Sequence, residues 1–289
     1  MLRLAVLLSW SLLAASAEEK VAVRHPNLRE SSGVTRSGRS ASLYWTHNDS
    51  GNGPQLFAFD LTGKLIGIWN VTGAENRDWE DIGIGPGPRA GQPYLYIADI
   101  GDNGRHRAKI SVYRVLEPRD ASAETANSTE PATRLDFTYP DGPHDAEALF
   151  VHPKSGAIYV VTKTRKAEKP GVYKAAAPHK PGADRALIRI GELNLPGDDP
   201  VGGMFGRVTG AAISPGGDRV ALCGYSGGYE ALAPQGKPFD GIFAAEWRPV
   251  DLGKRAQGEG VTYASDGRTL VLTSEGSPMM VTAIPRAAK

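Results

Sequence analysis

The sequence predicts an all-β protein, and more narrowly a β-propeller, from three observations. Short apolar runs bounded by Gly, Pro, Asp and Asn recur along the 289 residues, whereas helical periodicity is nearly absent after the first stretch. The 35 glycines and 21 prolines exceed average usage, which indicates many turns. One short frame also recurs five times, and such recurrence is typical of repeat architectures.

Each frame begins with a polar residue that is followed four positions later by an apolar one. The five frames are 30–34 (ESSGV), 80–84 (EDIGI), 147–151 (EALFV), 209–213 (TGAAI) and 259–263 (EGVTY). A turn and a second apolar strand follow each frame, at 43–46, 95–98, 158–161, 220–223 and 270–273. Each frame is therefore expected to form the innermost strand of one blade.

Further strands complete the units. Third strands are expected at 55–60, 110–115 and 171–174, and outer strands at 65–71, 133–139 and 187–193. Four antiparallel strands per unit, repeated at intervals of roughly 50 to 67 residues, match the blades of a propeller. Five blades are expected, and a sixth, degenerate blade in 225–258 is left open. A β-sandwich is the alternative fold, but it would not repeat one acidic frame.

The two ends of the chain are expected to share a blade. Strand-like segments at 21–23 and 279–284 could pair and close the ring. Residues 1–17 read as an export signal, with Arg3, an apolar core and a small-residue cleavage site before Glu18. Residues 18–289 are then expected to form a single propeller domain, secreted or periplasmic and monomeric, without a transmembrane segment after cleavage.

Charge and cysteine content exclude some classes of function. The formal net charge of +1 falls to about zero once Arg3 is removed, so nucleic acid is not an expected partner. Cys223 is the only cysteine, so no intrachain disulfide can form, and its apolar strand predicts a buried core residue.

The residues that open the frames are the candidate metal ligands. Innermost strands line the channel of a propeller, so Glu30, Glu80, Glu147, Thr209 and Glu259 are expected to ring its mouth. Carboxylates placed close together repel one another, and a bound divalent cation would relieve that repulsion. Ca²⁺ accepts six to eight oxygen ligands, so the predicted calcium ligands are Glu30, Glu80, Asp81, Glu147 and Glu259. Alternatively, each glutamate accepts backbone hydrogen bonds from a neighbouring blade and has a purely structural role.

Polar residues at the ends of the second strands are the candidate catalytic groups. Asp99 and His47 are expected as general bases, and Lys163 and Arg207 as cations that offset charge on an anionic substrate. Asp49, which follows His47 and Asn48, could ligate a metal or belong only to a turn.

Seven short motifs give the chain a resemblance to a known family. They are ESSG at 30–33, HNDSG at 47–51, DWEDI at 78–82, DIGDN at 99–103, DAEAL at 145–149, VTGAAISPGG at 208–217 and QGEGVTY at 257–263. In this order they resemble exported propellers of the phytase-like and esterase-like-phytase kind. The resemblance implies a propeller with Ca²⁺ near the channel and, in some relatives, hydrolysis of phosphate or other esters. Thr209 replaces the carboxylate of the fourth frame, and the sequence shows no cluster of phosphate-gripping basic residues.

Two functions follow, and they belong to different classes. The first is a metal-dependent hydrolase of phosphoric or carboxylic esters, acting on a small anionic or ester substrate. The second is a non-catalytic propeller that binds a ligand or an extracellular protein, in which the acidic ring is structural.

Overall fold

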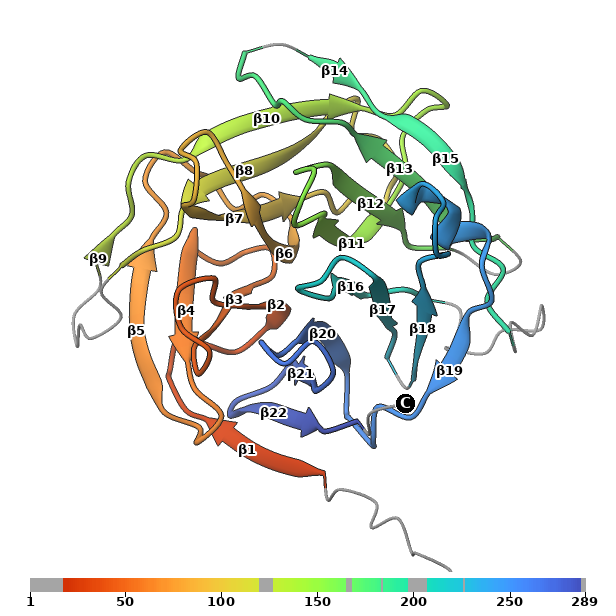
Figure 1. Ribbon diagram of the computed structural model, residues 1–289. Helices are drawn as coiled ribbons and strands as arrows, with labels where there is room; N and C mark the ends of the chain where they lie inside the picture. Colours follow the sequence, from red (N-terminus) through yellow and green to blue (C-terminus); the bar gives the residue numbers. More distant parts are fainter. Residues whose placement is uncertain are drawn as a thin grey trace, which may run out of the picture.

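A computed structural model describes residues 18–119, 127–164, 168–182, 184–196, 207–225 and 227–286. Five β-sheets stand like blades around a central axis, so the described chain forms a five-bladed β-propeller (Figure 1). This confirms the predicted fold class. The expected export signal, residues 1–17, lies outside the described residues.

Each predicted frame lies in or directly before the innermost strand of one blade, and the next two strands follow in chain order (Figure 1). The innermost strands are β2 (Ser31–Arg36), β6 (Trp79–Pro86), β11 (Ala146–Val151), β16 (Gly210–Ile213) and β20 (Gly258–Tyr263). The second strands are β3 (Tyr44–Asn48), β7 (Pro93–Asp99), β12 (Ile158–Thr162), β17 (Arg219–Cys223) and β21 (Leu270–Ser274). The third strands are β4 (Gln55–Phe59), β8 (Ile110–Leu116), β13 (Gly171–Ala175), β18 (Gly228–Leu232) and β22 (Met279–Ile284).

Each blade is completed by one outer strand. Blades 1 to 5 are numbered in the chain order of their innermost strands, so that blade 1 contains β2 and blade 5 contains β20. The outer strands are β5 (Leu65–Asn70), β10 (Thr133–Thr138), β15 (Ile188–Glu192), β19 (Arg248–Val250) and β1 (Glu19–Val23). Strand β1 pairs with β22 from Glu19 opposite Ala283 to Val23 opposite Met279, so the two ends of the described chain close the ring as predicted.

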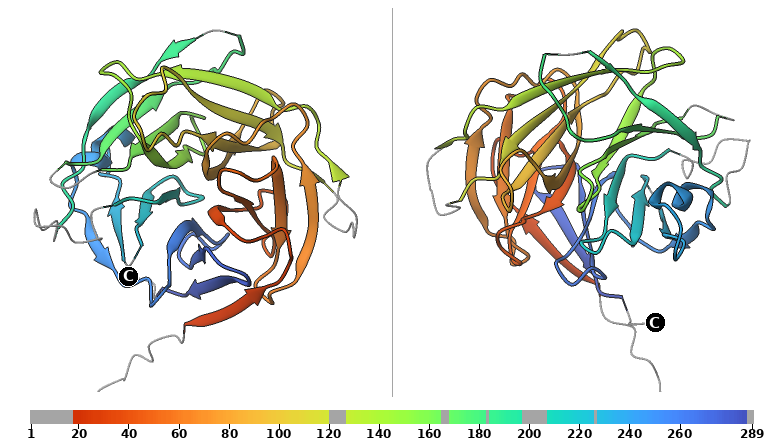
Figure 2. Two further views of the ribbon diagram at one scale, coloured as in Figure 1. Left: turned by 180° about the vertical axis from the view of Figure 1, so that it is seen from behind. Right: turned by 45° about the horizontal axis from the view of Figure 1, so that its top comes forward.

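Two short strands extend the blades beyond the predicted four. Strand β9 (Asn127–Ser128) adds to β5 in parallel, and β14 (Arg185–Ala186) adds to β10 in parallel. In the chain, β9 lies between β8 and β10 of blade 2, and β14 lies between β13 and β15 of blade 3. Each nevertheless joins the outer edge of the preceding blade (Figure 2). Blades 1 and 2 therefore have five strands.

The region in which a sixth blade was left open belongs to blade 4. Strands β18 and β19 pair with each other, and the 3₁₀ helix η2 (Phe239–Ala244) lies between them in the chain. No sixth sheet is present in the described parts of the chain. None of the helices in these parts has the length and apolar character needed to cross a membrane.

The hydrophobic core is divided into clusters that fill the interfaces between neighbouring blades. Successive strand residues point to opposite faces of a sheet, and both faces of a blade are covered. In β11, for example, Leu149 and Val151 pack toward blade 2, whereas Ala148 and Phe150 pack toward blade 4. This explains why the inner strands are continuous apolar runs rather than alternating ones.

Glycines let the innermost strands approach closely around the axis. A Cβ on Gly33 would lie 2.7 Å from the Asp81 Cα, and one on Gly210 would lie 2.4 Å from the Glu259 carbonyl oxygen. A cavity of about 20 Å³, comparable to the space of one water molecule, lies between these strands. The innermost strands therefore pack closely around the axis.

Candidate functional site

Three of the frame glutamates stand at β-bulges in the innermost strands. The register between the first two strands shifts between Trp79 and Asp81, at Glu80. Equivalent shifts fall at Glu147, between Ala146 and Ala148, and at Glu259, between Gly258 and Gly260. A bulge bends the strand and re-aims a side chain, which brings these carboxylates to one end of the axis.

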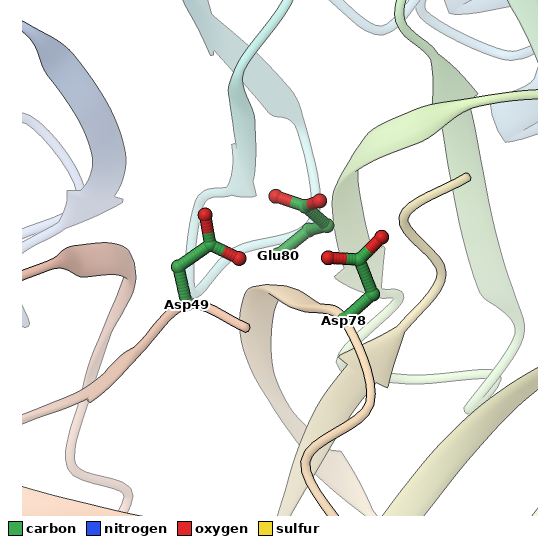
Figure 3. Close-up of side chains that lie close together, drawn as sticks. All are labelled: Asp49, Asp78 and Glu80. Atoms are coloured by element: carbon green, nitrogen blue, oxygen red, sulfur yellow. The ribbon is translucent and has the colours of Figure 1, made fainter. Parts of the chain in front are cut away.

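A triad of carboxylates lies at this mouth. Oxygen atoms of Asp49, Asp78 and Glu80 all lie within 4.8 Å of one another (Figure 3). Asp49 follows the end of β3 in blade 1, whereas Asp78 and Glu80 flank the start of β6 in blade 2. The triad therefore bridges two blades, and its spacing could hold a metal ion.

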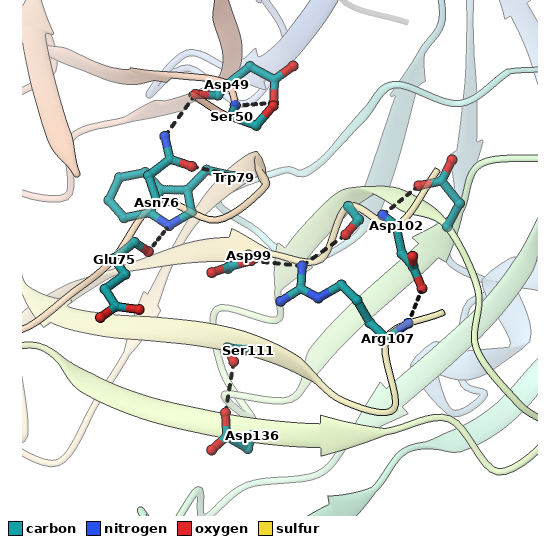
Figure 4. A network of polar contacts seen from close by, with 12 residues as sticks. Asp49, Ser50, Glu75, Asn76, Trp79, Asp99, Asp102, Arg107, Ser111 and Asp136 are labelled. Atoms are coloured by element: carbon teal, nitrogen blue, oxygen red, sulfur yellow. Dashed lines mark hydrogen bonds and ion pairs between the residues drawn. The ribbon is translucent and has the colours of Figure 1, made fainter. Parts of the chain in front are cut away.

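The loop before β6 holds this triad in place. The Asn76 side-chain amide donates to the Asp49 carbonyl oxygen at 2.8 Å and accepts from the Trp79 backbone N–H at 3.1 Å (Figure 4). The Gly101 N–H donates to the Asp78 carbonyl oxygen at 3.2 Å. Gly101 is required there, because a Cβ on it would lie 2.2 Å from Glu80 Oε1.

The electrostatics of the triad favour a cation. Burial raises the pKa of Asp49, and nearby Glu30 raises it further. Burial and then Asp49 raise the pKa of Asp78. The pKa of Glu80 lies well above its ordinary value because of burial and repulsion from Glu147, Asp49 and Asp78. Each of these acids would ionise more readily beside a positive charge.

A buried ion pair lies beside the triad. Lys163 Nζ donates to Glu147 Oε1, and the ammonium lies 5.4 Å from the centre of the Tyr225 ring. Burial raises the pKa of Glu147 to about 8 even with Lys163 against it. Burial alone would lower the pKa of Lys163, but Glu147 and Tyr225 raise it on balance. The pair places one cation among the acids of the mouth.

Further carboxylates surround this group. Burial raises the pKa of Glu259 to about 7, and Glu275 and Asp49 contribute. Glu259 Oε1 accepts a hydrogen bond from the Gln257 amide at 3.0 Å. Glu30 is exposed, and its Oε2 accepts from the Asn52 amide at 2.7 Å. Glu30, Glu80, Glu147 and Glu259 thus all belong to the neighbourhood of the mouth, although only Glu80 is part of the triad.

Asp81 and Thr209 are placed differently from the other frame residues. The fully buried Asp81 carboxylate accepts from the backbone N–H groups of Leu149, at 2.8 Å, and Ala211, at 3.1 Å. It therefore ties blade 2 to blades 3 and 4 and lies apart from the triad. The Thr209 hydroxyl donates to the Gly258 carbonyl oxygen at 2.9 Å, which ties blade 4 to blade 5.

The four residues expected to be catalytic differ in their surroundings. His47 is fully buried, its ring stands edge-on to Trp79 with centroids 5.6 Å apart, and burial lowers its pKa to about 4. Asp99 is buried and pairs with Arg107 Nη1 at 2.8 Å (Figure 4). Arg207 is exposed, and no hydrogen bond or ion pair of its side chain is recorded within the described ranges. Lys163 alone among these four contacts a carboxylate of the mouth.

Asp49 and Asp78 were underestimated by the sequence reasoning. The sequence leaves Asp49 open between a metal ligand and a turn residue, and it does not predict Asp78 as a ligand. The HNDSG motif at 47–51 and the DWEDI motif at 78–82 did mark both positions. Their convergence depends on neighbouring blades, which motif spacing alone does not specify.

Comparisons with known proteins leave the family of this chain open. No family model and no curated protein matches the sequence. One similar solved structure is a gluconolactonase from Xanthomonas campestris, with 13% sequence identity and a TM-score of 0.48 over 96% of this chain and 94% of that chain. So distant a likeness carries no activity over to this protein. The phytase-like family suggested by the motifs stays a prediction.

Proposed function

We propose that this protein is a divalent-cation-dependent hydrolase of phosphoric or carboxylic esters, with Ca²⁺ held at the mouth of the propeller. The observation that carries the proposal is the triad of Asp49, Asp78 and Glu80, whose oxygens lie within 4.8 Å of one another. Carboxylates this close are stable together only when they are protonated or neutralised by a cation.

The donor set fits a hard cation. The triad offers carboxylate oxygens and no imidazole or thiolate, which suits Ca²⁺ or Mg²⁺ better than zinc. Ca²⁺ accepts more ligands than three side chains supply, and Glu30, Glu147 and Glu259 surround the triad with further oxygens. The raised pKa values of Asp49, Asp78 and Glu80 are the second supporting feature.

The chain's own residues supply the remaining chemistry. A divalent cation bound here would polarise an ester or phosphoryl oxygen and lower the pKa of a bound water. Glu259, whose pKa burial raises to about 7, is partly ionised near neutral pH and can accept a proton from water. Lys163 places a positive charge beside an anionic substrate. We retain His47 and Asp99 as outer candidates for base catalysis and Arg207 as a further charge partner.

The experiment compares ester hydrolysis by wild-type protein and a Glu80→Gln variant, in Ca²⁺ and in chelator. p-Nitrophenyl acetate and p-nitrophenyl phosphate represent the two ester classes. Glu246→Gln is the matched control, since Glu246 is exposed and pairs only with Arg248. We expect calcium-dependent turnover in wild type and the control, and its loss in Glu80→Gln. Turnover that is absent from wild type, or equal in chelator, would refute the hydrolase.

A binding propeller with a structural cation is the second candidate. The observation that favours it is the surroundings of the two expected bases: His47 is fully buried, and Asp99 is held in a buried ion pair with Arg107. In that case chelator and Glu80→Gln should lower the melting temperature while no ester is hydrolysed. The partner would be a small ligand or an extracellular protein.

We also propose that the protein is exported as a single, monomeric propeller after removal of residues 1–17. The support is the leader-like sequence before Glu18. Amino-terminal sequencing of the protein recovered from outside the cytoplasm should begin at Glu18. Recovery of the uncleaved chain from the cytoplasm alone would contradict this proposal.

A further inference from the structure

A second cavity, of about 410 Å³, lies beside the acidic mouth on blade 2. Its walls come from the loop before β6, the end of β7, the loop before β8, and strands β8 and β10. This volume lies in the range of pockets that hold small organic molecules. Of the residues named for hydrolysis, only the outer candidate Asp99 lines this cavity.

Four cationic side chains and two carboxylates line this pocket. The cations are Arg77, Arg107, Lys109 and Arg134, and the acids are Glu75 and Asp99. The sequence showed no basic cluster, because these cations lie up to 57 positions apart and meet only in the folded blade.

Two of the four cations are held only by exposed ion pairs. Lys109 pairs with Asp184, and Arg134 pairs with Asp136 through Nε at 2.8 Å. Exposed pairs of this kind contribute little free energy, so a ligand anion can compete for these cations. Arg77 is exposed, and no hydrogen bond or ion pair of its side chain is recorded in the described part of the chain.

Arg107 is the fixed element of the pocket. Its side chain is almost fully buried, and Nη1 contacts Asp99 at 2.8 Å and the Gly101 carbonyl oxygen at 2.8 Å. Its backbone N–H donates to Asp102 Oδ2 at 2.7 Å (Figure 4). Its Nε is buried and has no hydrogen-bond partner among the described residues. A guanidinium held in one orientation in the wall of a pocket is suited to a carboxylate or a phosphate.

The pocket is separate from the mouth, although the two share a wall. Glu75 and Arg77 line the pocket, whereas Asn76 hydrogen-bonds toward Asp49 and Asp78 belongs to the triad. Successive residues of this loop thus face opposite sides. Anion binding in the pocket does not require a cation in the triad, so the two sites can be tested independently.

We propose that this pocket binds a small organic anion, whose carboxylate or phosphate is received by Arg107 and Arg77 and whose body occupies the rest of the cavity. Charge-assisted hydrogen bonds from guanidinium to an oxyanion are short and strong, and a guanidinium fork can bind both oxygens at once. A neutral molecule of the same size gains none of these bonds. The pocket should therefore discriminate by charge.

The test measures binding of phenyl phosphate, benzoate and neutral benzyl alcohol to the full chain in chelator, by calorimetry or ligand-observed NMR. We expect at least one anion to bind about tenfold or more tightly than benzyl alcohol. The stronger of the two anions identifies a phosphate or a carboxylate ligand. Inorganic phosphate, tested alone, shows whether the organic body contributes.

Arg77→Gln should weaken binding of the anion by about tenfold. Arg77 is exposed, so this variant is expected to fold. Arg89→Gln is the matched control, because Arg89 is also exposed and pairs with Glu130 in a different part of the blade. Equal binding of anions and benzyl alcohol, or equal losses in Arg77→Gln and Arg89→Gln, would overturn the inference. Binding of inorganic phosphate as tight as that of phenyl phosphate would overturn the organic-ligand part.

Because these measurements are made in chelator, their outcome separates this inference from the proposed hydrolase. Anion binding without any effect of Ca²⁺ on ester turnover would leave the pocket assigned and refute the hydrolase. Calcium-dependent turnover, with anions and benzyl alcohol bound equally, would support the hydrolase and refute the anion pocket.

Discussion

Replacing the buried Asp81 carboxylate is expected to lower the free energy of unfolding by about 2–6 kcal/mol. Its Oδ2 accepts from the Leu149 and Ala211 backbone N–H groups, and its Oδ1 accepts from Ile82. Asp81→Ala would leave the Leu149 and Ala211 donors buried without acceptors. Each unsatisfied donor costs about 1–3 kcal/mol, and the range stated is the sum for the two donors from neighbouring blades, without the Ile82 N–H.

Thermal and urea unfolding, followed by tryptophan fluorescence, measure this loss. At about 2 °C or more per kcal/mol for a chain of this size, the melting temperature should fall by at least about 4 °C. The control is Glu246→Ala, since Glu246 is exposed, pairs with the exposed Arg248 and should change stability by no more than about 0.5 kcal/mol. A melting temperature of Asp81→Ala equal to that of the control would refute the reasoning.

The same variant distinguishes a cross-blade tie from a metal ligand, the role that the sequence suggested for Asp81. If Asp81 only links the blades, Asp81→Ala should be less stable than wild type in chelator and should still be stabilised by Ca²⁺. Loss of the calcium response without any loss of stability in chelator would instead make Asp81 a ligand.

Three further predictions concern titration, reactivity and ring closure. The raised pKa values of Glu259 and Glu147, about 7 and about 8, mean that the folded chain retains protons that the unfolded chain releases above about pH 4.3. In chelator, the free energy of unfolding should therefore fall as pH rises from about 5 to 8. Over the same range, calorimetry should show the affinity for calcium rising. A free energy of unfolding that rises with pH, or a calcium affinity that falls, would contradict the raised pKa values. Burial raises the pKa of Cys223 to about 12, so a thiol-specific reagent should modify it only after unfolding, and rapid modification of native protein would show that it is accessible. Val23→Asp should lower stability by about 3 kcal/mol in urea unfolding, because β1 closes the ring and Val23 is fully buried; an unchanged midpoint would mean that closure contributes little.

The sequence was a good guide to the fold because its strongest signals are local. Apolar runs, turn residues and the recurring frame are all contained within a few positions, and they located the inner strands of every blade. Strands β9 and β14 were not anticipated, because each is two residues long and forms only by adding to the edge of another blade. The sequence leaves a sixth blade open in 225–258 because η2 interrupts the strand pattern there, and the described part of this region belongs to blade 4.

The site was harder to predict because it depends on contacts between blades. The register shifts at Glu80, Glu147 and Glu259 re-aim these side chains, and no residue pattern marked them as bulges. Asp49 meets Asp78 only because the end of β3 lies against the loop before β6. His47 directly precedes Asn48 at the end of β3, yet it packs against Trp79 between two blades instead of facing the mouth.

Calorimetric titration of Ca²⁺ into chelator-treated protein at about pH 8, above the pKa of about 7 of Glu259, tests the triad most directly. Wild type should show saturable binding, and Asp78→Asn and Glu80→Gln should each weaken it by about tenfold or more, whereas Glu246→Gln should leave it unchanged. The absence of binding to wild type, or equal affinities of wild type, Asp78→Asn and Glu80→Gln, would contradict a cation at this mouth.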